Sequence, residues 1–395
     1  MNRAIHVLLS ISFVFGLCTV SQANSAIEIE HTQLEVRISG RAYSLDALIA
    51  RPSKLEAGER LPVALISHGA AGRELPGSLT LALLSGWVRS FGARGYLAVA
   101  IMRRGYGESD GPAIRGKDTC EHPEPEAYLQ KQADDIAAAL DAIGRRGDAD
   151  SDKVLLVGHS AGGAAMLALA AREDVPVSAV LNISGGTFRY RPGEPLLPDV
   201  FEGCELYSQA MDTTFVRLAQ TNHVPTLWLY AVNDPYFPPR LARRWMNLWL
   251  KSGGQGQLQI LDAYQSNGHR MFIHREGQEV LWPKIDRFLK TQKFPTWNDA
   301  KFDELRRALG PRQRQKLNKF LASGTAMKAF AVPIDGKTKS YWFTDAFSLQ
   351  GARAEAYEFC RQDSGQDCIV VVENFEPTGM IPGRLNRKSK SSGDE

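Results

Sequence analysis

The sequence predicts an α/β fold: a mostly parallel eight-stranded sheet with helices on both faces, followed by a small C-terminal α+β module. Short, apolar, β-branched runs recur along the chain and alternate with helical patterns. The runs between Val63 and Ala231 are apolar at nearly every position, as expected for parallel strands buried on both faces. The pattern changes after about Phe294, where shorter elements follow.

In the large domain, strands and helices are expected to alternate through right-handed crossovers. The predicted strands are 34–38, 44–50, 63–67, 97–102, 154–157, 179–183, 226–231 and 257–261. The predicted helices are 81–94, 126–145, 163–172, 239–252 and 279–291. Two long connections, 103–125 and 185–224, leave the carboxyl ends of strands, where open α/β sheets bind ligands. We interpret both as lid candidates, and 185–224 as a lid-like insertion.

The remainder of the chain predicts a separate small unit. Residues 24–296 are assigned to the large domain, 297–378 to an accessory module and 379–395 to a disordered tail. In the module, an amphipathic helical stretch (300–324) precedes two strands (328–334 and 340–345), a helix (349–362) and a third strand (368–374). It contains no pattern of catalytic residues, so its role is expected to be structural or partner-binding, with the partner unknown.

Composition sets limits on the partners of the protein. The 395 residues are 44% hydrophobic and 23% charged, which is typical of a globular protein. The formal net charge is only +3, and the one basic run, 384–390, lies in the predicted tail. Nucleic acid is therefore not an expected partner.

The first residues predict export. Arg3 precedes an apolar stretch from Val7 to Val20, and Ser21-Gln22-Ala23 supplies small residues for cleavage. The stretch is short for a membrane span. We interpret residues 1–23 as a secretory signal peptide, with an uncleaved anchor as the alternative. The mature protein is then expected to be periplasmic or secreted, without stable membrane association.

Four cysteines remain after the predicted cleavage, and an even number in an exported protein favours disulfides. Cys120 and Cys204 lie in the two long connections, so a bridge between them is predicted at the mouth of the site. Cys360 and Cys368 lie at the end of a predicted helix and the start of a strand, where a bridge would stabilise the small module. The alternative is four unrelated buried thiols.

Two segments match the pattern G-x-S-x-G: Gly107–Gly111 (GESDG) and Gly158–Gly162 (GHSAG). A nucleophilic serine in this pattern requires a strand, a tight turn and a helix. GHSAG meets the requirement, because an apolar strand precedes it and an Ala/Leu-rich helix follows. GESDG is followed by Pro112, which prevents a helix from starting at once. Ser160 is therefore the predicted nucleophile, and Ser109 is assigned to a turn.

A serine hydroxyl needs an oriented base, and the partners are expected in the chain order Ser, acid, His. Asp234 directly follows the predicted strand 226–231, and His269 lies in a loop after the next strand. His223 precedes the strand that delivers the acid. His274 is interpreted as a surface or supporting residue. The predicted triad is Ser160, Asp234 and His269.

Such chemistry also needs backbone N–H groups that bind the developing oxyanion. One is expected from Ala161, the residue after the nucleophile. The other is expected from Ala70, in the small-residue loop His68–Gly72 that follows the strand 63–67. His68 itself is predicted to brace this loop. No metal or organic cofactor is expected.

Taken together, these segments resemble the α/β-hydrolase fold, close to its dienelactone-hydrolase and prolyl-oligopeptidase-like branch. The resemblance covers residues 35–289 and is carried by SHGAAG, RRGYGESDGP, VLLVGHSAGG, YAVNDPYFP and NGHRMF. It implies that the nucleophile, acid and base are Ser160, Asp234 and His269. The RRGYGESDGP segment resembles a structural turn of the family. Dienelactone hydrolases use a cysteine at the position of Ser160, and prolyl oligopeptidases carry an N-terminal propeller that this chain lacks.

The expected function is therefore that of an exported serine hydrolase acting on small carboxylic esters. A peptidase or amidase acting on short peptides is the alternative within the same chemistry, because both classes use the same triad. A non-catalytic binding protein on a hydrolase scaffold is the alternative from another class. The complete triad disfavours it.

Overall fold

The structure is a computed structural model that describes residues 27–71, 79–116, 119–188, 204–296, 299–323, 327–335, 339–344 and 348–383. Several parts of the sequence predictions fall outside these residues, among them the signal peptide (1–23), Gly72 of the predicted oxyanion loop, residues 117–118 and 189–203 of the two long connections, and residues 384–395 of the tail.

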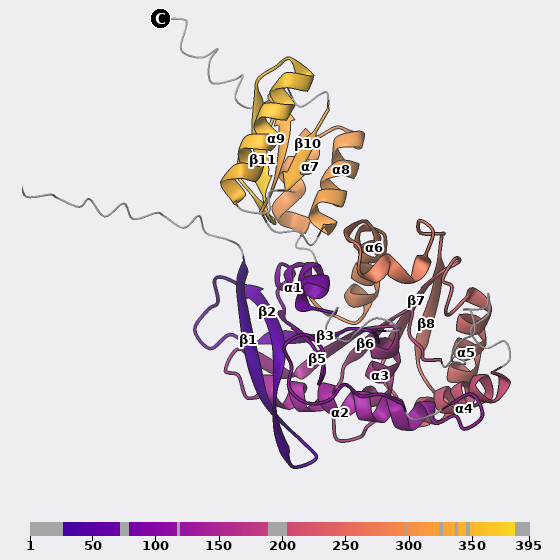
Figure 1. Cartoon of the computed structure of the whole chain (residues 1–395). Coiled ribbons are helices and arrows are strands. Elements are labelled where there is room, and N and C mark those ends of the chain that lie inside the picture. The colour runs from indigo at the N-terminus through magenta and orange to yellow at the C-terminus, as the bar shows by residue number, and fades with distance from the viewer. Residues whose placement is uncertain are drawn as a thin grey trace, which may run out of the picture.

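The large sheet has eight strands in the order β1-β2-β4-β3-β5-β6-β7-β8 (Figure 1). β1 and β2 form an antiparallel hairpin, β2 pairs antiparallel with β4, and the other neighbours are parallel. The prediction of a mostly parallel eight-stranded sheet is confirmed. The strands are β1 (Ile27–Ile38), β2 (Arg41–Pro52), β3 (Leu61–Ser67), β4 (Leu97–Ile101), β5 (Ala149–His159), β6 (Ala179–Ile183), β7 (Thr226–Ala231) and β8 (Gly256–Leu261).

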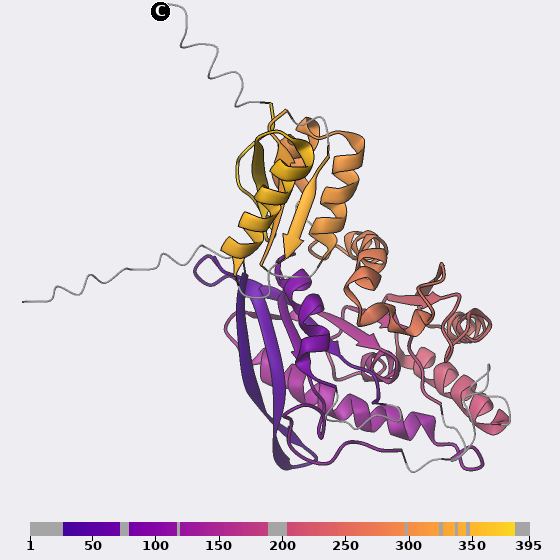
Figure 2. The same ribbon diagram turned by 45° about the horizontal axis from the view of Figure 1, so that its top comes forward.

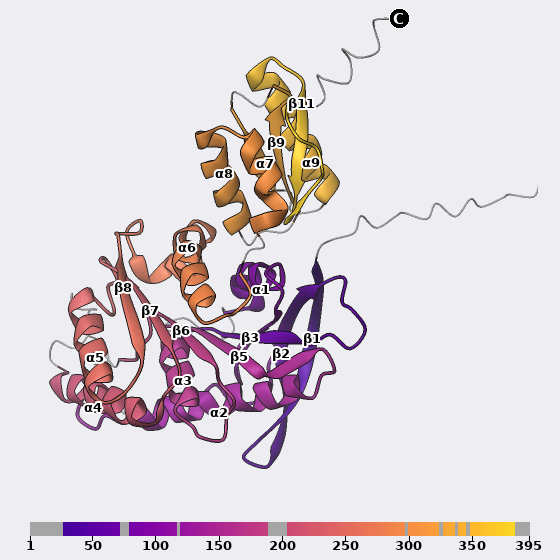
Figure 3. The same ribbon diagram turned by 180° about the vertical axis from the view of Figure 1, so that it is seen from behind.

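Helices cover both faces of this sheet (Figures 1 and 3), and for this reason the central strands are buried at nearly every position. One face carries α2 (Pro125–Gly144), α3 (Ala161–Ala170), α4 (Glu205–Thr221) and α5 (Pro239–Lys251), whose apolar residues form one core with the sheet. The other carries η2 (Leu81–Leu84), α1 (Ser85–Gly92) and α6 (Arg275–Thr291), which form a second core. A short turn of helix, η3 (Gly268–Phe272), precedes α6.

Helix α4 differs from the prediction of a lid over residues 185–224. Its residues Tyr207, Met211 and Phe215 recur every four positions and are fully buried, so they form one apolar face. This face packs into the core beside α2 and α5. Phe215 lies 5.3 Å from Trp228 and 4.9 Å from Trp245, measured between ring centroids. Residues 205–221 are therefore a core helix.

The predicted disulfide between Cys120 and Cys204 is present, with the two Cα atoms 5.0 Å apart. It joins the connection after β4 to the residue that precedes α4. Both cysteines are buried, so the bridge anchors the beginning of this helix.

The C-terminal residues form a second, four-stranded sheet in the order β10-β9-β11-β12, which confirms the small α+β module (Figure 2). The predicted helical stretch 300–324 is divided, because Gly310-Pro311 ends one helix and begins the next. The two-residue strand β12 was not predicted. The elements are η4 (Asp299–Phe302), α7 (Asp303–Ala308), α8 (Pro311–Ala322), β9 (Lys328–Pro333), β10 (Tyr341–Thr344), α9 (Leu349–Ser364), β11 (Cys368–Glu373) and β12 (Glu376–Pro377).

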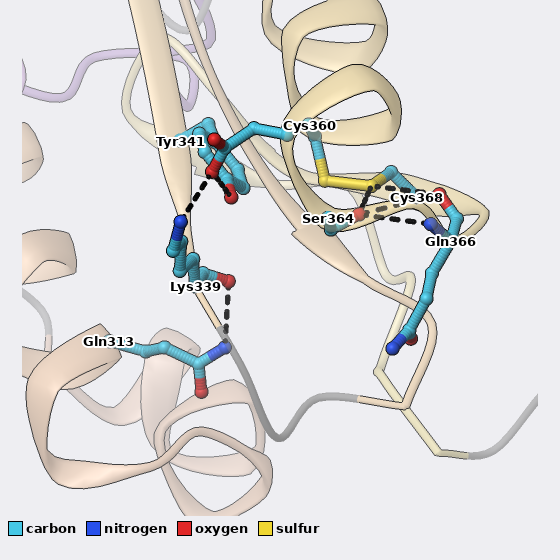
Figure 4. Close-up of a disulfide and its surroundings, with 8 residues drawn as sticks. Gln313, Lys339, Tyr341, Cys360, Ser364, Gln366 and Cys368 are labelled. Atoms are coloured by element: carbon cyan, nitrogen blue, oxygen red, sulfur yellow. Dashed lines mark hydrogen bonds and ion pairs between the residues drawn. A yellow bond between two sulfur atoms is a disulfide. The ribbon is translucent and has the colours of Figure 1, made fainter.

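The second predicted disulfide, Cys360–Cys368, joins α9 to the start of β11 (Figure 4). Ser364 lies between them, and its hydroxyl accepts a hydrogen bond from the backbone N–H of Gln366 at 3.2 Å. The bridge therefore closes the tight connection between α9 and the sheet.

The module lies beside α6 of the large domain, with α8 as the contacting helix. The Arg275 guanidinium lies 5.1 Å from the centre of the Trp342 ring, a cation–π contact that joins the two units. Across the described ranges, no helix is both long enough and apolar enough to cross a membrane.

Candidate active site

Ser160 occupies the tight turn between β5 and α3. Its backbone has φ of 55° and ψ of −128°, a conformation that costs a non-glycine residue about 1–3 kcal/mol. Hydrogen bonds maintain it: the Ser160 N–H donates to the Ile183 carbonyl at 3.0 Å, and the Gly186 N–H donates to the Ser160 carbonyl at 3.1 Å. The sequence prediction of a strand–turn–helix around this serine matches these elements.

The structure brings His269 and Asp234 together. His269 lies in η3, after β8, and its Nδ1 is 3.1 Å and 3.0 Å from the two carboxylate oxygens of Asp234, which follows β7. A carboxylate only accepts hydrogen bonds, so Nδ1 carries the proton and donates it. In the neutral imidazole with this tautomer, the Nε2 atom of His269 has no proton and can act as a base.

The surroundings of Asp234 favour its charged form. Its side chain is fully buried, and one carboxylate oxygen accepts the backbone N–H groups of Tyr236 and Phe237, both at 3.0 Å. Burial by itself raises the pKa of this carboxyl, but His269, the Phe237 N–H and the Ser184 hydroxyl outweigh it and lower the pKa. Asp234 is therefore an anion that can orient the imidazole.

His159 connects the serine turn to the His269 loop, a role that the sequence analysis missed. Its Nε2 lies 2.9 Å from the His269 carbonyl oxygen, so this nitrogen carries the proton and donates. Its ring is parallel to that of Phe272, with 4.8 Å between the centroids. Burial, followed by the charge of His269, lowers the pKa of His159 to about 3. A neutral His159 thus links the backbone of His269 to the residue that directly precedes Ser160.

Gly268 allows the base to approach the acid. A Cβ atom at this position would lie 2.5 Å from the Ala231 Cβ and 2.5 Å from the Asn233 Oδ1. The Gly268 N–H also donates to the Asn233 carbonyl at 3.1 Å. The loop that carries His269 is therefore packed directly on the loop that carries Asp234.

The two predicted oxyanion-hole residues come from two segments, since Ala161 directly follows Ser160 and Ala70 lies in the loop after β3. Ala161 is the first residue of α3, so its N–H has no acceptor within the helix. Ala70 follows β3 in an exposed position. A Cβ atom on the preceding Gly69 would lie only 2.9 Å from the Ser160 Cβ, which places this loop against the turn.

The residues that the sequence analysis set aside lie in other settings. The Ser109 hydroxyl accepts the Asp46 N–H at 2.8 Å and donates to the Met102 carbonyl at 2.7 Å, so it belongs to a turn. His274 Nδ1 lies 3.3 Å from the Tyr264 hydroxyl. His223 is exposed, on the connection between α4 and β7.

Aromatic side chains surround His269. The ring centroids of Tyr236 and Phe237 lie 4.7 Å and 5.7 Å from that of His269. Phe188, from the connection after β6, lies 5.2 Å from Tyr236. Phe188 is thus beside the candidate site, whereas Tyr207 and Phe215, farther along the same connection, are in the core.

One group with metal-ligating side chains occurs among the described residues: His31, Asp46 and Glu108, whose donor atoms lie within 4.8 Å of one another. His31 Nε2 already lies 2.6 Å from an Asp46 carboxylate oxygen. None of the predicted triad residues belongs to this group.

Residues 64–308, more than half of the chain, match the model of the alpha/beta hydrolase family. No curated protein matches the chain. Similar solved structures include a candidate dienelactone hydrolase from Klebsiella pneumoniae subsp. pneumoniae (16% identity, 68% of this chain and 99% of that chain, TM-score 0.45). An acetyl xylan esterase from Paenibacillus sp. R4 is 18% identical, over 67% of this chain and 84% of that chain, with a TM-score of 0.48. An acylaminoacyl peptidase from Pyrococcus horikoshii is 14% identical, over 67% of this chain and 41% of that chain, with a TM-score of 0.46.

Proposed function

We propose that this chain, which belongs to the alpha/beta hydrolase family, is an exported serine hydrolase that cleaves carboxylic esters through an acyl-enzyme intermediate. The observation that carries the proposal is the 3.0 Å contact between His269 Nδ1 and the buried Asp234 carboxylate, at the edge of the sheet where Ser160 lies between β5 and α3. A carboxylate-oriented imidazole next to a nucleophilic serine is the arrangement that activates a hydroxyl for acyl transfer.

In the proposed acylation step, His269 Nε2 removes the proton of the Ser160 hydroxyl while its oxygen attacks the ester carbonyl carbon. The carbonyl oxygen becomes an oxyanion, which accepts hydrogen bonds from the N–H groups of Ala161 and Ala70. Each such donor contributes about 3–4 kcal/mol to transition-state stabilisation. His269 then returns its proton to the leaving alkoxide as the carbon–oxygen bond breaks, and Asp234 stabilises the transient imidazolium.

Deacylation repeats these steps with water. His269 takes a proton from the water molecule as its oxygen attacks the acyl-enzyme carbonyl, and the same N–H groups bind the second oxyanion. Collapse of the intermediate releases the carboxylic acid, and the proton on His269 returns to Ser160. No step requires a group other than these side chains and the backbone.

Two further parts of the proposal concern the whole chain. The two disulfides favour an oxidising compartment, which agrees with export directed by residues 1–23. We also propose that the hydrolase domain spans 24–296 and that 297–378 is an accessory module.

The aromatic residues Phe188, Tyr236 and Phe237 favour an apolar group on the substrate.

A fluorophosphonate probe tests the nucleophile directly, because the hydroxyl oxygen of an activated serine attacks its phosphorus, displaces fluoride and becomes phosphonylated. Peptide mapping is expected to place the label on Ser160, with Ser160→Ala unlabelled and Ser109→Ala labelled normally. Absence of labelling in a folded wild-type protein would instead support a non-catalytic role.

The substrate class is tested with p-nitrophenyl esters of graded acyl length, measured beside peptide p-nitroanilides. A burst of p-nitrophenol equal to the enzyme concentration is expected where deacylation is slower than acylation. Faster turnover of the anilides than of every ester would overturn the ester assignment in favour of a peptidase.

A further inference from the structure

Arg103 is a buried cation next to the loop that carries Ala70. It follows β4, and its side chain has no solvent exposure. The guanidinium donates to three acceptors of the segment 67–69: the Ser67 hydroxyl, the His68 carbonyl at 2.6 Å and the Gly69 carbonyl at 2.9 Å. All three acceptors are neutral.

Arg103 forms no direct ion pair among the described residues, although the Asp135 carboxylate bound by Arg104 interacts with its charge at longer range. Among the described residues, no carboxylate lies within ion-pair distance of its guanidinium, and its Nε has no hydrogen-bond acceptor. The next residue, Arg104, forms an ion pair with Asp135 at 2.8 Å. Burial of a cation without a directly bonded anion costs several kcal/mol, and the hydrogen bonds from Arg103 to the segment 67–69 partly offset this cost.

His68 completes the set of donors to the Gly69 carbonyl. Its Nε2 accepts the backbone N–H of Arg103 at 3.1 Å, so the proton of the neutral ring is on Nδ1. That Nδ1 lies 2.6 Å from the Gly69 carbonyl oxygen and donates to it. Burial, followed by the charge of Arg103, lowers the pKa of His68 well below its usual value and keeps the ring neutral. The Gly69 carbonyl is therefore held by two donors.

The direction of the Ala70 N–H follows from this contact. The Gly69 carbonyl and the Ala70 N–H belong to one trans peptide unit, in which the two groups point in opposite directions. Donors that hold the carbonyl on the Arg103 side thus direct the N–H to the other side of the loop. The loop is close to the nucleophile at Gly69, because a Cβ atom added there would lie 2.9 Å from the Ser160 Cβ.

We propose that Arg103, together with His68, is a positioning residue that holds the Gly69–Ala70 peptide so that the Ala70 N–H points at the oxyanion. The positive charge of Arg103, buried beside this loop, also stabilises the negative charge that develops there. This inference rests on the proposed function. It assigns the buried arginine of the RRGYGESDGP turn to catalysis through the oxyanion loop.

The test compares Arg103→Met and Arg103→Lys with Arg104→Met, a matched control that removes a neighbouring arginine paired elsewhere. Each variant is assayed for kcat and KM on the best ester, and for inhibition by a trifluoromethyl ketone and by the matching methyl ketone. Only the trifluoromethyl ketone forms a stable tetrahedral oxyanion with the enzyme. Far-UV circular dichroism and thermal unfolding confirm that each variant is folded.

Arg103→Met is expected to lower kcat about 100-fold with KM changed less than about threefold, because the lost interaction acts mainly in the transition state. Its affinity for the trifluoromethyl ketone is expected to fall by a similar factor, while methyl ketone binding is unchanged. Arg103→Lys is expected to recover part of kcat, since an ammonium keeps the charge but not the three-acceptor geometry. Arg104→Met is expected to keep kcat within about threefold.

Equal losses for both ketones, or an unchanged kcat in folded Arg103→Met, would overturn the inference while leaving the proposed function intact. If Arg103→Met does not fold, His68→Phe replaces it, because it preserves the ring packing on Tyr106 and removes the donor to Gly69. The same selective loss is expected there, at about tenfold. A wild-type protein that fluorophosphonate does not label would overturn both the proposed function and this inference.

Discussion

Gly107–Gly111 and Gly158–Gly162 share the pattern G-x-S-x-G, and each follows a strand of the same sheet, but they fold for different physical reasons. In the first segment the glycines have the positive φ values, 54° and 76°, and the serine hydroxyl is used to close a turn. In the second, the positive φ of 55° belongs to Ser160 itself.

The glycines of the second segment are required for space. A Cβ on Gly158 would lie 2.4 Å from the Gly162 carbonyl oxygen, and a Cβ on Gly162 would lie 2.2 Å from the His68 carbonyl oxygen. The same residue types thus provide backbone freedom in one segment and close packing of a strained serine in the other. This difference indicates which serine is available for chemistry.

The largest expected difference between the two segments is in activity. Ser160→Ala is expected to lower kcat for ester hydrolysis by about 10⁴-fold or more, because the nucleophile is removed. Ser109→Ala is expected to keep kcat within about threefold. Steady-state kinetics of both purified variants measure this difference. Equal losses of kcat would contradict the assignment of Ser160 as nucleophile and Ser109 as a turn residue.

The next largest effect concerns the glycines. Gly162→Ala is expected to destabilise the protein by about 2–4 kcal/mol and to abolish turnover, because the new Cβ would collide with the backbone of the oxyanion loop. Gly111→Ala places its Cβ near a Tyr43 ring carbon, at 2.9 Å, and is strained mainly by its positive φ. A loss of about 1–2 kcal/mol with normal kcat is expected there. Urea unfolding and ester assays give both quantities.

The residue before each serine provides a comparison that depends on pH. The pKa of His159 in the folded protein is about 3, below its usual 6.5, so the unfolded chain binds a proton that the folded protein does not. The contribution of neutral His159 to the free energy of unfolding is fully present above pH 6.5, and it is lost as the pH falls toward 3. His159→Phe is expected to reduce this acid-dependent loss by roughly 2–4 kcal/mol.

Glu108 occupies the position equivalent to His159 in the other segment and is exposed. Glu108→Ala is the matched control, and it is expected to retain the wild-type pH dependence of the unfolding free energy between pH 6.5 and 3. If the unfolding free energy of His159→Phe fell with pH as steeply as that of wild type, the buried neutral histidine would not be the origin of the acid-dependent loss of stability.

The smallest expected effect is on stability at Ser109. Ser109→Ala removes the acceptor for the Asp46 N–H and the donor to the Met102 carbonyl, which is expected to lower the free energy of unfolding by about 1–2 kcal/mol. Ser160→Ala is expected to change it by less than about 0.5 kcal/mol. Chemical denaturation of the two variants measures the difference, and the opposite order would contradict this account.

The sequence by itself determined the sheet, because strand residues buried on both faces must be apolar at nearly every position and turns require particular residues. It also determined both cysteine pairs and selected Ser160, Asp234 and His269 from their order at successive strand ends. Parallel strands place their carboxyl ends at one edge of the sheet, and this geometric rule needs no knowledge of side-chain packing.

Only the tertiary structure decided which groups meet across that edge. The sequence was interpreted as a lid-like insertion over residues 185–224, and within it residues 205–221 form α4, whose apolar face packs into the core beside α2 and α5. The contacts of His159 with the His269 loop, and of Arg103 with the segment 67–69, join residues 34 to 110 positions apart. Such contacts depend on how the crossover connections pack against one another. Hydrophobic periodicity and turn residues in the sequence do not predict them.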